Sequence, residues 1–125
     1  MPAPRRLLAL ALVGLAALAA PAAGCLSPTL PLPPPEAPDT IQEEGAGSWL
    51  VAGACTDHAT VFVGDVKTGS GIFRACTHGS YAITVPAKKC DTGFVSEEID
   101  GEMSAEAKFV FQEVSEGMPT GGPCE

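Results

Sequence analysis

The residues best suited to chemistry in this chain are its five cysteines and two histidines. Cys55 with His58, and Cys76 with His78, would supply the two cysteines and two histidines of a structural zinc site. In an exported protein, however, thiols are more often oxidised to disulfides than bound to a metal. We therefore expect neither a metal nor a cofactor, and we interpret both histidines as turn residues.

A second candidate is the acidic run SEEIDGEMSAE, which offers carboxylate oxygens of the kind that calcium binds. The run lacks the D-x-[DN]-x-[DN]-G spacing of an EF-hand loop, whereas its Asp-Gly pair is typical of a hairpin turn. A cation site and a solvated hairpin are thus the two interpretations, and we favour the hairpin. The acidic residues of the run are Glu97, Glu98, Asp100, Glu102 and Glu106.

Catalytic motifs are missing from the sequence. It contains no G-x-S-x-G, no H-E-x-x-H and no glycine-rich loop that could hold a phosphate. The only two histidines stand close to cysteines, which leaves little from which to build a Ser-His-Asp or Cys-His arrangement. We predict that the protein is not an enzyme.

The first 24 residues have the plan of an export signal. Arg5 and Arg6 precede an apolar run over residues 7–20, and small residues follow it. The apolar run is shorter than the roughly 20 residues that a membrane-spanning helix needs. We expect residues 1–24 to be a cleaved signal peptide and the mature chain to contain no transmembrane helix.

The residues AAGC, which end at Cys25, resemble a bacterial lipobox, in which small residues precede a cysteine that receives a diacylglyceryl group. The resemblance implies that Cys25 carries a lipid, with palmitate among the acyl chains, and that the protein is anchored to a membrane outside the cytoplasm. The alternative is ordinary signal cleavage, after which Cys25 is unmodified. Cysteine parity favours lipidation, because an even set then remains for two disulfides. That set is Cys55, Cys76, Cys90 and Cys124.

Composition divides the mature chain into two parts. Residues 25–47 begin with Cys25, the expected lipidated N-terminus, and are rich in proline, which predicts an extended tether. Residues 48–125 form a domain so small that cross-links help to stabilise it. Without the two signal arginines, five basic residues face fifteen acidic ones, so the net charge is near −10. This charge argues against a nucleic-acid partner and suits a cationic one.

Alternation of apolar and polar residues between glycine-rich breaks predicts an all-β domain, a small antiparallel sandwich or meander with two disulfides. The last segment is ambiguous, because it combines helix-forming residues with an alternating KFVFQEV, and we favour a strand. In an up-and-down meander, the strand directions place Cys55 beside Cys76 and Cys90 beside Cys124. The expected strands are 49–54, 59–66, 72–77, 81–86, 94–99 and 105–114.

The run VGDVKTGSGIFRA, followed by THGSYAITVP, resembles the repeated pattern of carboxypeptidase regulatory-like domains, which are small transthyretin-like β-sandwiches. That pattern is G-x-V-x-D-x-x-T-G and later G-x-Y-x-I-x-V-P. The resemblance implies a structural or binding module on an exported protein, with structural roles for the matching residues. These are Gly69, Gly79, Tyr81, Ile83 and Pro86.

Together these features predict a lipid-anchored lipoprotein of the bacterial cell envelope that acts as a non-catalytic surface binding or structural module. Its expected partners are the membrane, through the anchor, and an envelope component or cationic protein. The alternative function is an acidic inhibitor of a basic secreted enzyme.

The anchor can be tested directly. If Cys25 is lipidated, the mature protein should partition into detergent and exceed the mass of residues 25–125 by a diacylglyceryl group, with or without a further acyl chain. Cys25→Ser should abolish both properties, because serine has no thiol to form the thioether. An unmodified wild-type mass in the aqueous phase would contradict lipidation.

Overall fold

The structure of the protein is a computed structural model that describes residues 32–122 and residue 124, and this part of the chain is built from strands without a helix. Accordingly, no helix in the described residues is long and apolar enough to cross a membrane. The signal peptide, Cys25 and its lipidation lie outside the described residues.

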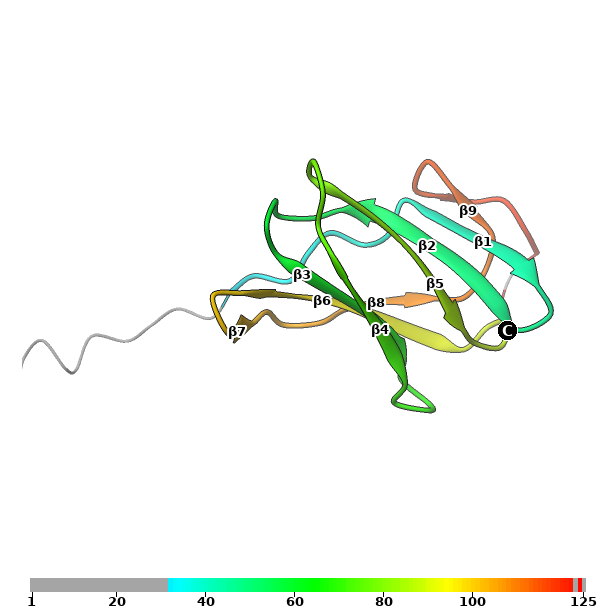
Figure 1. Ribbon diagram of the computed structural model, residues 1–125. Helices are drawn as coiled ribbons and strands as arrows, with labels where there is room; N and C mark the ends of the chain where they lie inside the picture. The colour runs from blue at the N-terminus through cyan, green and yellow to red at the C-terminus, as the bar shows by residue number, and fades with distance from the viewer. Residues whose placement is uncertain (1–31, 123, 125) are drawn as a thin grey trace, which may run out of the picture. The chain divides into compact units, whose positions relative to one another are not determined.

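Two antiparallel sheets pack face to face (Figure 1). Sheet I has the strand order β10 (Met118–Pro119), β9 (Val114–Ser115), β1 (Thr40–Gly45), β2 (Ser48–Ala54) and β5 (Ser80–Pro86). Sheet II has the order β4 (Gly71–Ala75), β3 (Thr60–Asp65), β6 (Thr92–Ile99) and β7 (Glu102–Met103), and β8 (Ala107–Val110) also pairs with β6. The predicted small antiparallel sandwich is confirmed.

The core lies between the sheets and follows from the two-residue period of the strands. Buried and more exposed positions alternate along all of β2 and β5, because successive side chains of a strand point to opposite faces. Trp49 of β2 is 1% exposed and packs against Phe111, with ring centroids 6.1 Å apart. Further side chains that fill the core are Val51, Val61, Val63, Ile83, Val85 and Val95.

Five of the six predicted strands are confirmed within about two residues, and the sixth is wrong in part. The segment 105–114 does not form one strand, because the chain leaves sheet II after β8 and enters sheet I at β9. The predicted hairpin turn is confirmed: Asp100 and Gly101 both have positive φ, at 52° and 82°, as a tight turn between twisted strands requires.

The predicted domain start at Ser48 is too late. β1 lies in the stretch expected to be a tether, pairs with both β2 and β9, and buries Ile41 to 2% exposure. Upstream of β1, Pro38 is buried, and the Leu32 carbonyl accepts a hydrogen bond from the Ala105 N–H at 3.4 Å. The Pro-rich segment from residue 32 therefore packs against the sandwich, although residues 33–37 form no strand.

The meander is also wrong, although the disulfide pairing derived from it is right. After the β3–β4 hairpin the chain crosses back to sheet I, where β5 pairs with β2, and then crosses again so that β6 pairs with β3. The strands from β2 to β6 still alternate in direction (Figure 1), and β8 runs antiparallel to β6, as the sixth strand of a meander would. The strand ends that carry the cysteines therefore fall where the simpler topology places them.

Removing β1 should destabilise the protein. A chain that begins at residue 48 loses the burial of Ile41 and the backbone partner of both β2 and β9, and we expect its free energy of unfolding to fall by about 3 kcal/mol or more. A chain that begins at residue 32 should match the mature protein in urea unfolding. Equal midpoints for the 32 and 48 starts would contradict a structural role for β1.

Candidate functional site

Three phenylalanines form a row across the outer face of sheet II, and we call them the aromatic row. Phe62 of β3 lies opposite Phe73 of β4, and their rings stack with centroids 4.2 Å apart and planes 12° apart. Phe94 of β6 meets Phe62 edge-on at 5.2 Å. The neighbouring Val63 and Val95 are fully buried between the sheets, so strand alternation turns the phenylalanines outward.

Two glycines allow the Phe62 and Phe94 rings to lie close to the backbone of the neighbouring strand. A Cβ atom on Gly71 would lie 2.5 Å from Cε2 of Phe62, and one on Gly64 would lie 2.7 Å from Cζ of Phe94. Glycine inside a strand often marks such a close approach. The rings of Phe62 and Phe94 therefore lean over the backbone of the neighbouring strand, and the row spans three strands.

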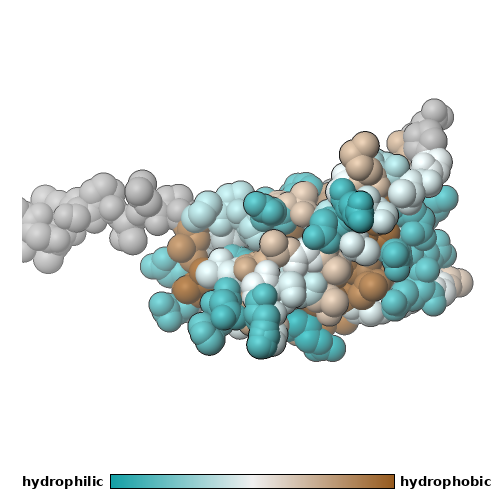
Figure 2. Space-filling view, turned by 90° about the horizontal axis from the view of Figure 1, so that it is seen from above, coloured by the Kyte–Doolittle hydropathy of each residue, from teal (hydrophilic) through white to brown (hydrophobic). Residues whose placement is uncertain are grey.

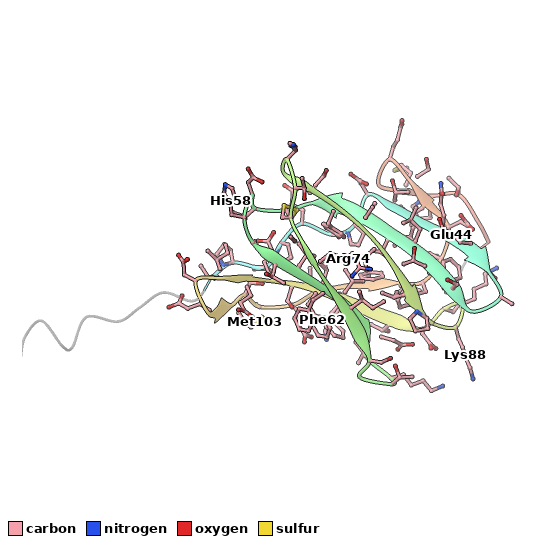
Figure 3. All side chains as sticks on the ribbon, viewed as in Figure 1. Glu44, His58, Phe62, Arg74, Lys88 and Met103 are labelled. Carbon is pink, nitrogen blue, oxygen red and sulfur yellow. A yellow bond between two sulfur atoms is a disulfide. The ribbon has the colours of Figure 1, made fainter. Side chains whose placement is uncertain are left out.

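Other side chains extend the outer face of sheet II beyond the aromatic row. Phe73 is 52% exposed, and Met103, which lies on the same face opposite Glu98, is 48% exposed. At the other end of the row, the Lys108 Nζ atom lies 5.7 Å from the centre of the Phe94 ring. Figure 3 shows Phe62 and Met103 on the lower side of sheet II. The side seen from above in Figure 2 has hydrophilic residues along its edges and pale or brown, more apolar residues toward its middle.

Sequence reasoning did not find the aromatic row. A local signal exists, because Phe62 and Phe94 each adjoin a valine of the core and stand near a glycine. That signal indicates on which face of its strand each phenylalanine lies. It does not show that the three rings meet, because this depends on the pairing of β3 with both β4 and β6.

The four predicted disulfide cysteines are joined as expected. Cys55, after β2, is bonded to Cys76, after β4, with Cα atoms 6.0 Å apart, and so links sheet I to sheet II. Cys90, between β5 and β6, is bonded to Cys124 with Cα atoms 5.3 Å apart and holds the C-terminal segment. The bonded sulfurs are not free thiolates, and no cluster of three or more metal-ligating side chains occurs in residues 32–122 and 124.

The histidines lie in turns, as predicted. His58 and His78 both have positive φ, at 69° and 55°, and the His58 side chain is 95% exposed at the end of the loop between β2 and β3 (Figure 3).

The acidic run forms the β6–β7 hairpin, but one of its members is not solvated. Glu97 is only 5% exposed, and its carboxylate accepts hydrogen bonds from the Thr56 backbone N–H at 2.7 Å and the Thr56 hydroxyl at 3.0 Å. It points inward because it shares the face of Val95 and Ile99, and it ties the β2–β3 loop to β6. The exposed members are Glu98, Asp100, Glu102 and Glu106.

Tyr81 lies near this buried carboxylate. Its side chain is 5% exposed, and its hydroxyl has no hydrogen-bond partner. Burial raises the pKa of the Tyr81 phenol above its ordinary value, and the negative charges of Asp39 and Glu97 raise it further. The phenol therefore stays neutral at pH values where an exposed tyrosine would ionise.

No family model matches the chain, and no curated protein and no solved structure matches it significantly. The aromatic row and the buried polar groups are accordingly interpreted from their own geometry.

Tyr81→Phe tests the buried phenol. The pKa of the Tyr81 phenol is higher in the folded protein than in the unfolded chain, where it is about 10. The resulting contribution to the free energy of unfolding is therefore fully present below about pH 10 and is lost as the pH rises above that value. We expect Tyr81→Phe to be as stable as the wild type or more stable at neutral pH, because it removes an unpartnered hydroxyl, and to lack this alkaline loss. Since Tyr81 is the only tyrosine, phenolate absorbance reports it alone. Phenolate formation at the same pH in folded and urea-unfolded protein would contradict the prediction.

Proposed function

We propose that the protein is a lipoprotein of the bacterial cell envelope, anchored outside the cytoplasm through Cys25, and that it acts as a non-catalytic binding module. Its two disulfides support an oxidising compartment outside the cytoplasm. The export signal and the lipobox-like AAGC support the anchor.

The observation that carries the binding function is the half-exposed Phe73 at the open end of the aromatic row. One face of its ring stacks on Phe62, so the other is available to solvent. Contiguous exposed apolar surface can mark an interaction site, and Phe73 and Met103 are both about half-exposed on this outer face. Phe94 is only 7% exposed, so the accessible part of the aromatic row is the stacked pair of Phe73 and Phe62. We propose that this pair contacts an envelope component, and that this component is recognised by apolar contact rather than by charge.

Phe73→Ser should remove this contact without unfolding the domain. The substitution lies at an exposed position of the edge strand β4 and should lower the free energy of unfolding by about 1 kcal/mol, the value of a cross-strand aromatic pair. Both proteins carry Cys25→Ser in this assay, so that a lipid anchor cannot bring them down with the membrane. We expect the protein with Phe73 to cosediment with purified envelope material at low and high salt, and Phe73→Ser to cosediment much less.

Met118→Ser is the matched control, because Met118 is 68% exposed on β10 of sheet I. It should bind as well as the wild type. Equal losses in the two variants would contradict a role for the aromatic row. A salt-sensitive complex with a cationic enzyme that Phe73→Ser leaves intact would instead support the alternative, an acidic inhibitor of a basic secreted enzyme.

A further inference from the structure

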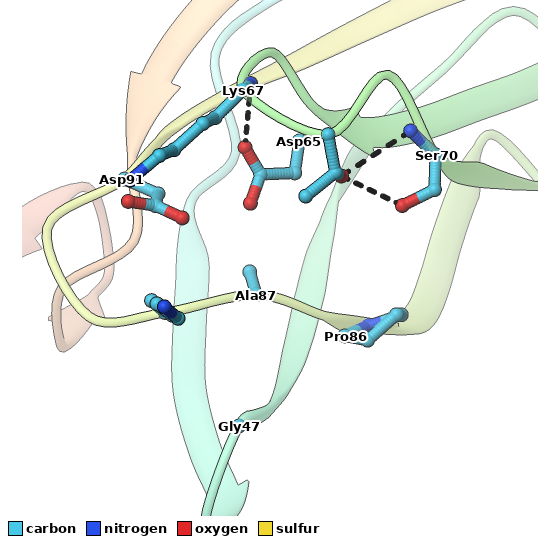
Figure 4. A pocket seen from close by; sticks show the side chains of 9 residues that line it. Gly47, Asp65, Lys67, Ser70, Pro86, Ala87 and Asp91 are labelled. Carbon is cyan, nitrogen blue, oxygen red and sulfur yellow. Dashed lines mark hydrogen bonds between the residues drawn. The ribbon is translucent and has the colours of Figure 1, made fainter.

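A cleft of about 290 Å³ opens at the end of the sandwich, between the β3–β4 turn and the segment that follows β5 (Figure 4). The turn contributes Asp65 and Lys67, and the opposite wall contains Pro86, Ala87 and Lys88. Asp91 stands at one side. The cleft is separate from the aromatic row and is not part of the binding function proposed above.

Asp65 is the most buried charged group of this cleft, at 1% exposure. One carboxylate oxygen, Oδ1, accepts a hydrogen bond from the Lys67 backbone N–H at 2.8 Å. Figure 4 shows the second oxygen facing the cleft, with no hydrogen bond from the residues that line it. This oxygen is not among the buried side-chain atoms that lack a partner, so it is accessible from the cleft. A charged donor on a ligand could therefore form a strong hydrogen bond to it.

Both signs of charge are available around the cleft. Lys67 and Lys88 are exposed, and Asp91 is half-buried. In Figure 4 the Lys67 side chain extends toward Asp91. The ion pairs found among residues 32–122 and 124 are His58–Asp57 and Lys108–Glu106, so neither lysine of the cleft is held by a carboxylate within 4 Å. A ligand with a positive and a negative group therefore finds a counter-charge for each.

The size of the cleft limits the ligand. Its volume of about 290 Å³ lies just below the roughly 300–1,000 Å³ typical of small-molecule sites. A single amino acid or a dipeptide fits such a volume, whereas a long polymer would leave most of its length outside. Pro86 and Ala87 offer apolar contact to a small side chain.

We propose that this cleft binds a small zwitterion, an α-amino acid or a dipeptide, whose ammonium group donates to the free oxygen of Asp65 and whose carboxylate lies against Lys88. Asp65 also accepts a hydrogen bond within its own turn, so its role in the turn must be separated from its role in binding.

Asp65→Asn makes that separation. The amide oxygen of asparagine can still accept the Lys67 N–H, so the turn is preserved, but the negative charge is lost. The experiment is an NMR titration of the mature chain, carrying Cys25→Ser so that no detergent is needed, with alanine and with alanyl-alanine. We expect shifts of the Ser70 and Ala87 amides, and binding about tenfold or more weaker in Asp65→Asn, as for the loss of one charge-assisted hydrogen bond.

Three controls define the chemistry. N-acetylalanine lacks the ammonium group and should bind the wild type no better than it binds Asp65→Asn. Lys88→Gln should weaken alanine binding several-fold. Asp57→Asn removes an exposed charge of the β2–β3 loop and should bind as the wild type does. Equal binding of alanine by Asp65→Asn and wild type, or no shift at about 10 mM alanine or alanyl-alanine, would overturn the proposal.

Discussion

Pairing of β5 with β2, rather than with β4, decides the rest of the architecture. Seven residue pairs from Ser48–Pro86 to Ala54–Ser80 join these strands, and β3 and β4 are left to form a hairpin in the opposite sheet. β4 thereby becomes an edge strand on which Phe73 is half-exposed. β6 then pairs with β3 and brings Phe94 beside Phe62. The end of β5 meets the β3–β4 turn and forms the wall of the cleft.

Local pattern was sufficient for those strands that bury every second residue along their length. β2 and β5 alternate throughout, and both were predicted within one residue. β1 was missed because TIQEEG contains a single apolar residue, Ile41, and so shows no alternating pattern. This strand is held in the sheet by backbone pairing with β2 on one side and β9 on the other. The break between β8 and β9 was missed for a related reason: KFVFQEV alternates continuously, and only tertiary contacts show that its two ends belong to different sheets.

The same distinction applies to the functional residues. Disulfide pairing was predictable because it depends on strand direction, which alternates from β2 to β6 (Figure 1) as it does in a meander. The aromatic row depends on which strands are neighbours, and that information is not local. Glu97 illustrates a third case. The acidic run was correctly assigned to a hairpin, but its first glutamate is buried, because it lies on the same inward face as Val95. Its carboxylate accepts two hydrogen bonds from Thr56.

The net charge is −8 over all 125 residues and near −10 without Arg5 and Arg6, but neither value describes each surface of the protein. Lys67, Lys88 and Lys89 lie near the cleft, whereas Glu98, Asp100 and Glu102 lie at the β6–β7 turn. β6 has eight residues and separates the two regions, a length of about 26 Å at 3.3 Å per residue. Exposed charges are screened over about 8 Å at physiological salt, so the acidic hairpin has little influence at the cleft. The cationic partner that composition predicts would therefore be attracted at the hairpin end, whereas binding in the cleft would depend on the charges that line it.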